Sequence, residues 1–133
     1  LASFPYFKQR PEHLWFQPLS GDSLGRKNVF AVVKGKPGSK KTVVFHGHTD
    51  TVGIEDFGLN KHLATNPQKL RDYFADWDQD EDVRQDARSN DWMFGRGSLD
   101  MKSGVAVHLV NVLRLSEQAY ELDGNVVFMA NPV

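Results

Sequence analysis

The chain has 133 residues, of which 40% are hydrophobic and 25% charged, and this is long enough for a domain with a buried core. Sixteen basic and 17 acidic side chains leave a net charge of −1, which argues against nucleic-acid binding and against attachment to an anionic membrane. No apolar run has the length of a membrane span and no signal-peptide core stands near the start, so we expect a cytoplasmic protein. Cysteine does not occur, so any metal must be held by His, Asp or Glu.

The first part of the chain predicts strands that follow an irregular start. Residues 1–28 are mixed and punctuated by proline, with a turn at 20–25, and we expect them to wrap the edge of a sheet. The runs 29–33 and 42–45 are β-branched and aromatic, and the turn-forming segment 35–41 separates them. This pattern predicts a β-hairpin or an adjacent pair of strands, the second of them buried.

The middle of the chain predicts one short helix beside an acidic surface. Asn66 and Pro67 are a cap and a first helical residue, and apolar residues recur at helical spacing over 68–77. The acidic cluster that begins at Asp76 resembles the start of a calcium-binding EF-hand loop. Glu81 stands where that loop needs glycine, and Ala87 where it needs a bidentate glutamate, so a solvated acidic surface is favoured.

The last part predicts a buried helix followed by a buried strand. Over 101–119 the residues Val105, Leu109, Val112 and Leu113 share one helical face, which Ala106 and Val110 widen. After a turn at 123–125, residues 126–130 form a continuous apolar run of the kind found inside sheets covered by helices. Strand, helix and strand in this order predict an α/β fold with a right-handed crossover, in which a mixed, mostly parallel sheet is flanked by helices.

Two motifs lie where α/β proteins place their chemistry, at a strand end and at a helix start. The first is HGHTD, in which neutral His48 could bind zinc while Asp50 orients its ring; the alternative is a strand-end histidine beside an Asx-turn. The second is GRGSLDMKSG, in which Asp100 could be a simple helix N-cap, although the string is more specific than a cap requires.

Together with NVVFMANPV at 125–133, these motifs resemble the family of zinc-dependent exopeptidases and deacylases that includes glutamate carboxypeptidase, aminoacylase, acetylornithine deacetylase and succinyl-diaminopimelate desuccinylase. Within that family, the sequences of these motifs are most similar to those of the arginine-utilisation branch. The resemblance implies that His48 binds one metal, that Asp50 steers this histidine and that Asp100 bridges two metals, zinc or cobalt. The general base would be the first glutamate of an acidic pair expected just after Val133.

The resemblance makes residues 1–133 the N-terminal part of a metallopeptidase-like catalytic domain, with a charged insertion at about 53–90. The expected function is hydrolysis of an amide bond in a short peptide or N-acyl amino acid, by a longer enzyme that is a homodimer. The chain alone would then lack the general base and be inactive. The alternative is an inactive α/β binding or structural module with a relic half-site. A further alternative, the H-x-H-x-D-H signature of metallo-β-lactamase-like hydrolases, is weakened because Thr51 stands where its next histidine belongs.

Overall fold

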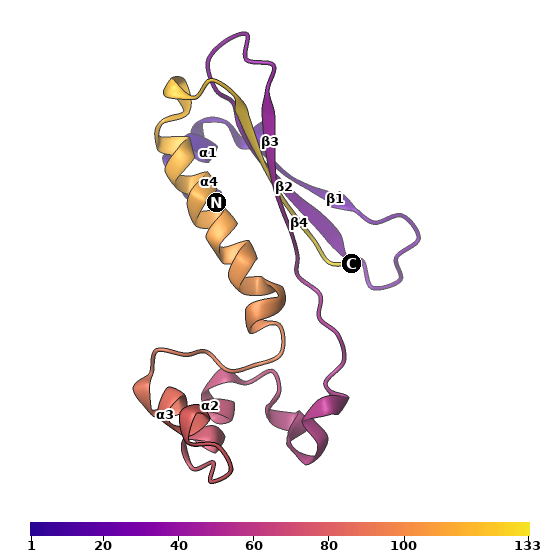
Figure 1. The fold of residues 1–133 in the computed structure, drawn as a ribbon. Helices are drawn as coiled ribbons and strands as arrows, with labels where there is room; N and C mark the ends of the chain where they lie inside the picture. The colour runs from indigo at the N-terminus through magenta and orange to yellow at the C-terminus, as the bar shows by residue number, and fades with distance from the viewer. The chain divides into compact units, whose positions relative to one another are not determined.

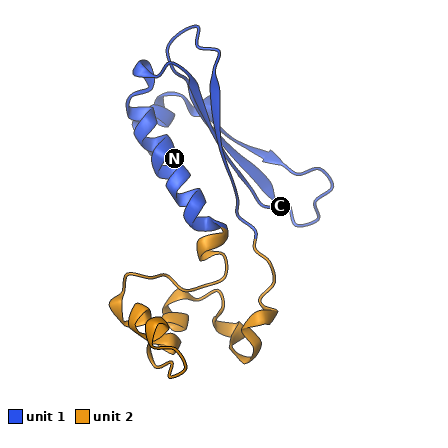
Figure 2. Ribbon diagram, in the orientation of Figure 1, with its two compact units in different colours: residues 1–50, 101–133 blue, residues 51–100 orange.

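A computed structural model describes all of residues 1–133, and the chain divides into two compact units (Figure 2). Unit 1 consists of residues 1–50 and 101–133, and unit 2 of residues 51–100. None of the helices is long and apolar enough to cross a membrane.

Unit 1 is built on a four-stranded sheet with the order β1-β2-β4-β3 (Figure 1). Its strands are β1 (Leu14–Pro18), β2 (Lys27–Val33), β3 (Thr42–His48) and β4 (Asn125–Asn131). The mixed α/β architecture expected from the sequence is confirmed, although β3 with β4 is the one parallel pair, whereas β1 with β2 and β2 with β4 are antiparallel. A parallel pair needs a long crossover, and only the connection from β3 to β4 carries a long helix.

The predicted pairing of β2 with β3 is wrong, because β4 lies between them. In β4 every second residue is buried, namely Val126, Phe128 and Ala130, so this strand takes the centre of the sheet. Strand β3 is left at the edge, where Val43 and Val44 are each more than half exposed rather than buried as expected. The irregular N-terminal segment contributes the opposite edge strand, β1, which the sequence pattern did not reveal.

The core of unit 1 lies between one face of the sheet and α4 (Gly104–Glu117), with the short helix α1 (Pro5–Gln9) beside it (Figure 1). The long helix is shorter than the predicted 101–119, because residues Ser98–Ser103 form a π-helical turn before it. Val112 is fully buried, but Val110 and Ala106 are exposed, since α4 meets the sheet along only one narrow stripe. Two single 3-10 turns, Pro11–His13 and Ala119–Glu121, complete the unit.

Unit 2 contains a 3-10 segment, η2 (Glu55–Leu63), and two helices, α2 (Pro67–Ala75) and α3 (Glu81–Ser89). The predicted start of α2 is confirmed: the side chain of Asn66 accepts a hydrogen bond from the backbone N–H of Lys69, at 3.1 Å. In the acidic cluster, the Asp80 carboxylate accepts hydrogen bonds from the N–H groups of Asp82 and Val83, so it caps α3, a helix that the sequence analysis did not predict.

A buried histidine makes unit 1 sensitive to acid. His13 is 8% exposed, and its Nδ1 lies 3.0 Å from the hydroxyl of Tyr6, which accepts a hydrogen bond from the backbone N–H of Lys34. Burial lowers the pKa of His13 below its usual 6.5; the Glu12 carboxylate opposes this effect, and the cations of Lys34 and Arg10 add to it.

We therefore expect the free energy of unfolding of unit 1 to fall as the pH drops below about 6.5. In that range His13 is protonated in the unfolded state but less so in the folded state, because its pKa is lower there. The free energy of unfolding therefore rises with pH until the unfolded histidine is also neutral. Hydrogen exchange of the β2 amides, followed between pH 5 and 8, measures the effect. His13→Asn should flatten this dependence, and an unchanged slope in that variant would assign it to other groups.

Candidate metal centre

His48 is the last residue of β3, at the end of the sheet where the parallel strands β3 and β4 both finish. It pairs with Asn131, the last residue of β4. In α/β proteins, ligands bind beyond the carboxyl ends of parallel strands, because loops there bring side chains from different strands together. The register of the two strands therefore places the HGHTD motif at the end of the sheet suited to a site.

Asp50 contacts the His48 ring. The carboxylate Oδ1 of Asp50 lies 3.2 Å from Nδ1 of His48, and its backbone oxygen lies 3.3 Å from the same nitrogen. Both oxygens are acceptors, so these hydrogen bonds require the proton of a neutral ring to be on Nδ1. The lone pair is then on Nε2, the arrangement of a histidine that binds a metal through Nε2 while a carboxylate fixes its ring.

Gly47 lets the side chains of Met101 and Val105 pack closely against the HGHTD motif. A Cβ on Gly47 would lie 2.8 Å from Cγ2 of Val105 and 3.0 Å from Cε of Met101, so only glycine leaves these side chains in place. On the other face of β3, Nε2 of His46 lies 2.6 Å from Oδ1 of Asn131. The backbone oxygen of Asn131 also accepts a hydrogen bond from the N–H of Thr49, at 2.7 Å. Asn131 thus ties HGHT to β4, a role that its position just after an apolar run did not signal.

Arg26 brings a positive charge to the same end of the sheet. It immediately precedes β2, whose first residue Lys27 pairs with Pro18, and Val29 pairs with Ala130, so the β1–β2 loop adjoins the end of β4 (Figure 1). Asp22 holds Arg26 by accepting hydrogen bonds from Nε (3.0 Å) and Nη2 (2.7 Å).

These hydrogen bonds raise the pKa of Arg26; burial opposes the rise, and the negative charges of Asp22 and Asp50 add to it. The same contacts with Arg26 lower the pKa of Asp22. Sequence reasoning did not single out Arg26; the only signal was the Asp-to-Arg spacing of four residues across a glycine-flanked turn.

Asp100 lies in unit 2, as its last residue, and within the π-helical turn Ser98–Ser103. It is therefore not the N-cap of α4, which is Ser103. Gly97 precedes this turn with φ of +80°, a backbone conformation that favours glycine. Single π-helical turns next to α-helices are frequent at functional sites.

Arg96 anchors the segment that precedes Asp100 to other residues of unit 2. Its guanidinium forms an ion pair with Asp56 and lies over the ring of Phe57, with Cζ 5.2 Å from the centroid. Its backbone N–H donates to the carbonyl of Ala64, at 2.7 Å. The Arg96 hydrogen bond lowers the pKa of Asp56, so that carboxylate stays ionised in the pair.

The chain offers metal donors but not a complete donor set. The structure brings His48 and Asp50 together in unit 1, and Asp100 belongs to the other unit. No group of three or more His, Asp or Glu side chains that could hold a metal forms in the chain. An imidazole held by a carboxylate and a separate aspartate fit zinc in ligand type, since zinc takes nitrogen and carboxylate oxygen ligands, but they do not make up its usual four.

Comparison with known proteins agrees with the motifs. The family model "Peptidase family M20/M25/M40" matches residues 44–133, a stretch that includes His48, Asp50 and Asp100. Protein RocB of Bacillus subtilis (strain 168) is 53% identical over 132 residues, which cover 99% of this chain and 23% of that protein. The uncharacterized protein YqjN of the same strain is 38% identical, with the same coverage of both chains.

A succinyl-diaminopimelate desuccinylase of Cereibacter sphaeroides (strain ATCC 17029 / ATH 2.4.9) is 32% identical over 106 residues, which cover 80% of this chain and 22% of that enzyme. The chain thus spans under a quarter of the length of each of these relatives. The model match covers more than half of the chain and contains both motifs, so the chain belongs to peptidase family M20/M25/M40.

Proposed function

We propose that the complete protein containing this chain is a dinuclear metal-dependent hydrolase that cleaves the amide bond of an N-acyl amino acid or short peptide. The observation that carries the proposal is the His48 ring, held at Nδ1 by Asp50 at the carboxyl end of β3, inside the segment that the family model matches. The sequence identity with RocB and the sequences of the motifs support a role of the complete protein in arginine utilisation.

In this proposal His48 and Asp100 would hold the metals, zinc or cobalt, with Asp100 as a ligand common to both. Bound there, the metals would supply Lewis-acid polarisation of the scissile carbonyl and a water of lowered pKa. Asp50 keeps the proton on Nδ1 of His48 and so presents Nε2 for ligation. The proposal assigns the general base and the other ligands to residues of the complete protein outside these 133, as the family resemblance implies.

We further propose that residues 1–133 are the N-terminal part of the catalytic domain and that about 53–90 is a charged insertion. Unit 2, residues 51–100, contains this segment and folds around its own helices, which supports the idea. The complete enzyme is proposed to be a homodimer that takes a small peptide or acyl-amino-acid substrate.

The test is made on the protein encoded by the complete reading frame that contains the chain. Release of free amine is measured with a panel of N-acetyl and N-succinyl amino acids and dipeptides, before and after removal of metal by a chelator. Hydrolysis that the chelator abolishes and that zinc or cobalt restores is the expected result. A protein that hydrolyses nothing in its metal-loaded form would instead be the inactive binding module that the sequence left open.

A further inference from the structure

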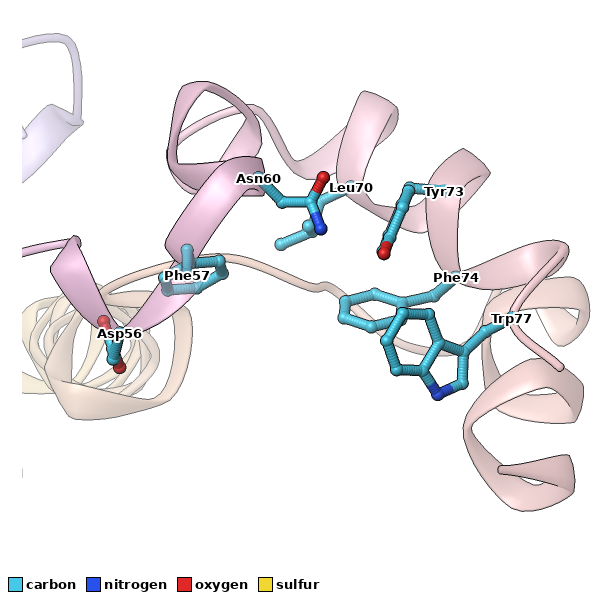
Figure 3. Close-up of a pocket in the computed structure, with 7 residues that line it drawn as sticks. All are labelled: Asp56, Phe57, Asn60, Leu70, Tyr73, Phe74 and Trp77. Carbon is cyan, nitrogen blue, oxygen red and sulfur yellow. The ribbon is translucent and has the colours of Figure 1, made fainter. Parts of the chain in front are cut away.

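A cavity of about 330 Å³ lies wholly within unit 2, between the 3-10 segment η2 and helix α2 (Figure 3). This volume is within the range of about 300–1,000 Å³ that small-molecule sites occupy. The cavity is lined by Asp56, Phe57, Asn60, Leu70, Tyr73, Phe74 and Trp77.

Most of the wall is an apolar stripe of α2. Leu70, Tyr73 and Phe74 of α2 lie on one helical face, and Trp77, which follows the end of the helix, continues the stripe; Leu70 is 2% exposed. The Tyr73 and Phe74 rings meet edge to face at 5.3 Å between centroids, and Phe74 and Trp77 do so at 5.5 Å. The three rings are only half buried, so the stripe forms a rigid aromatic surface with a face left open.

The only ionic group on the wall is already neutralised. Asp56 is paired with Arg96, whose guanidinium also covers the ring of Phe57. Because Asp56 is paired with Arg96, it has no charge left to compensate a ligand ion, and the apolar remainder of the wall would remove water from a cation or an anion alike. The charges on the wall therefore favour a ligand without net charge.

Two neutral polar groups remain to orient such a ligand. Figure 3 shows the Asn60 amide and the Tyr73 hydroxyl directed toward the space bounded by Phe57 and Trp77, and neither makes a hydrogen bond within the chain. An amide side chain offers a donor and an acceptor side by side, the complement of another primary amide.

We propose that this cavity is a binding site for an uncharged planar molecule that carries an amide-like edge. Its ring would stack on the aromatic stripe of α2, and its polar edge would meet Asn60. The site is separate from the proposed metal ligands and does not depend on the proposed hydrolase function.

A ligand bound in the cavity is expected to stabilise the segment 95–100, which contains Asp100. A ligand against Phe57 and Asp56 packs on the partners that hold Arg96, and Arg96 anchors the segment 95–97 to Ala64. Bound ligand should therefore slow hydrogen exchange over residues 95–100 at least about twofold.

The experiment titrates the complete protein with three probes that share a ring, benzamide, benzoate and benzylamine, by calorimetry. Benzamide is expected to bind about tenfold more tightly than either ion, because only the ions lose hydration without gaining a partner. Trp77→Leu and Asn60→Leu should each weaken benzamide about tenfold. Trp92→Leu, a matched change of an exposed tryptophan in the same unit, should leave it unchanged.

Equal affinity for the three probes would overturn the proposal, and so would a preference for benzylamine, which would make the cavity a cation cage. Benzamide binding that survives both Trp77→Leu and Asn60→Leu would also overturn it, because the ligand would then lie elsewhere. Asn60 lies in the 3-10 segment rather than in α2, so it decides the matter even if Trp77→Leu unfolds the helix.

Discussion

Under the proposed function, replacement of His48 by alanine in the complete protein is expected to lower kcat/KM for its best amide substrate at least about 10³-fold. In that proposal His48 is a zinc ligand, and its loss would remove several kcal/mol of stabilisation of the developing negative charge, where each 1.4 kcal/mol is worth a factor of ten. Bound zinc, measured by atomic emission, should fall in parallel. Asp50→Asn keeps the size of the side chain but weakens its hold on Nδ1, and we expect a smaller loss, about 10- to 100-fold.

The matched control for His48→Ala is His62→Ala. His62 is an exposed histidine whose Nδ1 lies near the carbonyl of Leu59, and it lies outside both motifs. Its variant should retain zinc and activity. If His48→Ala kept full zinc content and activity, the metal ligands would have to be sought outside the HGHTD motif.

Gly35→Ala is expected to destabilise unit 1 by about 3 kcal/mol, the upper part of the range for overpacking a close contact. A Cβ at this position would lie 2.3 Å from the carbonyl oxygen of Gly124 and 2.5 Å from that of Leu122. Both are backbone atoms at the entrance to β4, and neither can move without displacing the strand. The N–H of Lys36 also donates to Leu122 O at 2.8 Å, so a shift would break this bond as well.

Hydrogen exchange of the β2 and β4 amides measures the loss as a lower free energy of opening. Gly53→Ala is the control, because a Cβ there would meet nothing within 4 Å and its φ lies outside the left-handed region. That variant should stay within about 0.5 kcal/mol of the parent, as surface substitutions usually do. A Gly35→Ala protein as stable as the Gly53→Ala protein would mean that the turn before β4 moves easily to make room for the added methyl group.

Local chemistry explains which parts of the fold could be predicted. The Asn66–Pro67 start of α2 is encoded within a few residues, because a cap acts on the backbone N–H groups next to it. The apolar run of β4 likewise signals a buried strand wherever it lies. β1 escaped detection because Leu14, Trp15 and Phe16 do not alternate with polar residues, and the strand is defined by its pairing with β2.

In the candidate site, too, contacts between residues close in sequence could be predicted, and contacts between distant segments could not. The spacing of His48 and Asp50 is a property of the chain, so a contact between them could be anticipated from two residues of separation. Arg26 could not be anticipated at the same end of the sheet, since it arrives there through the pairing of β2 with β4. Asn131 joined the HGHT segment for a similar reason, through its parallel pairing with β3.

The sequence by itself determined the family, the two motifs and the type of each regular element it recognised, because these depend on residue identity and short spacing. The tertiary structure decided which strands are neighbours, since β4 enters between β2 and β3 only after the crossover through α4. It also decided why glycine is needed at position 35, which the sequence indicated only as part of a turn. That glycine leaves space for the backbone of the turn that leads into β4, some 90 residues away along the chain, and contacts between distant segments are set by packing rather than by local preference.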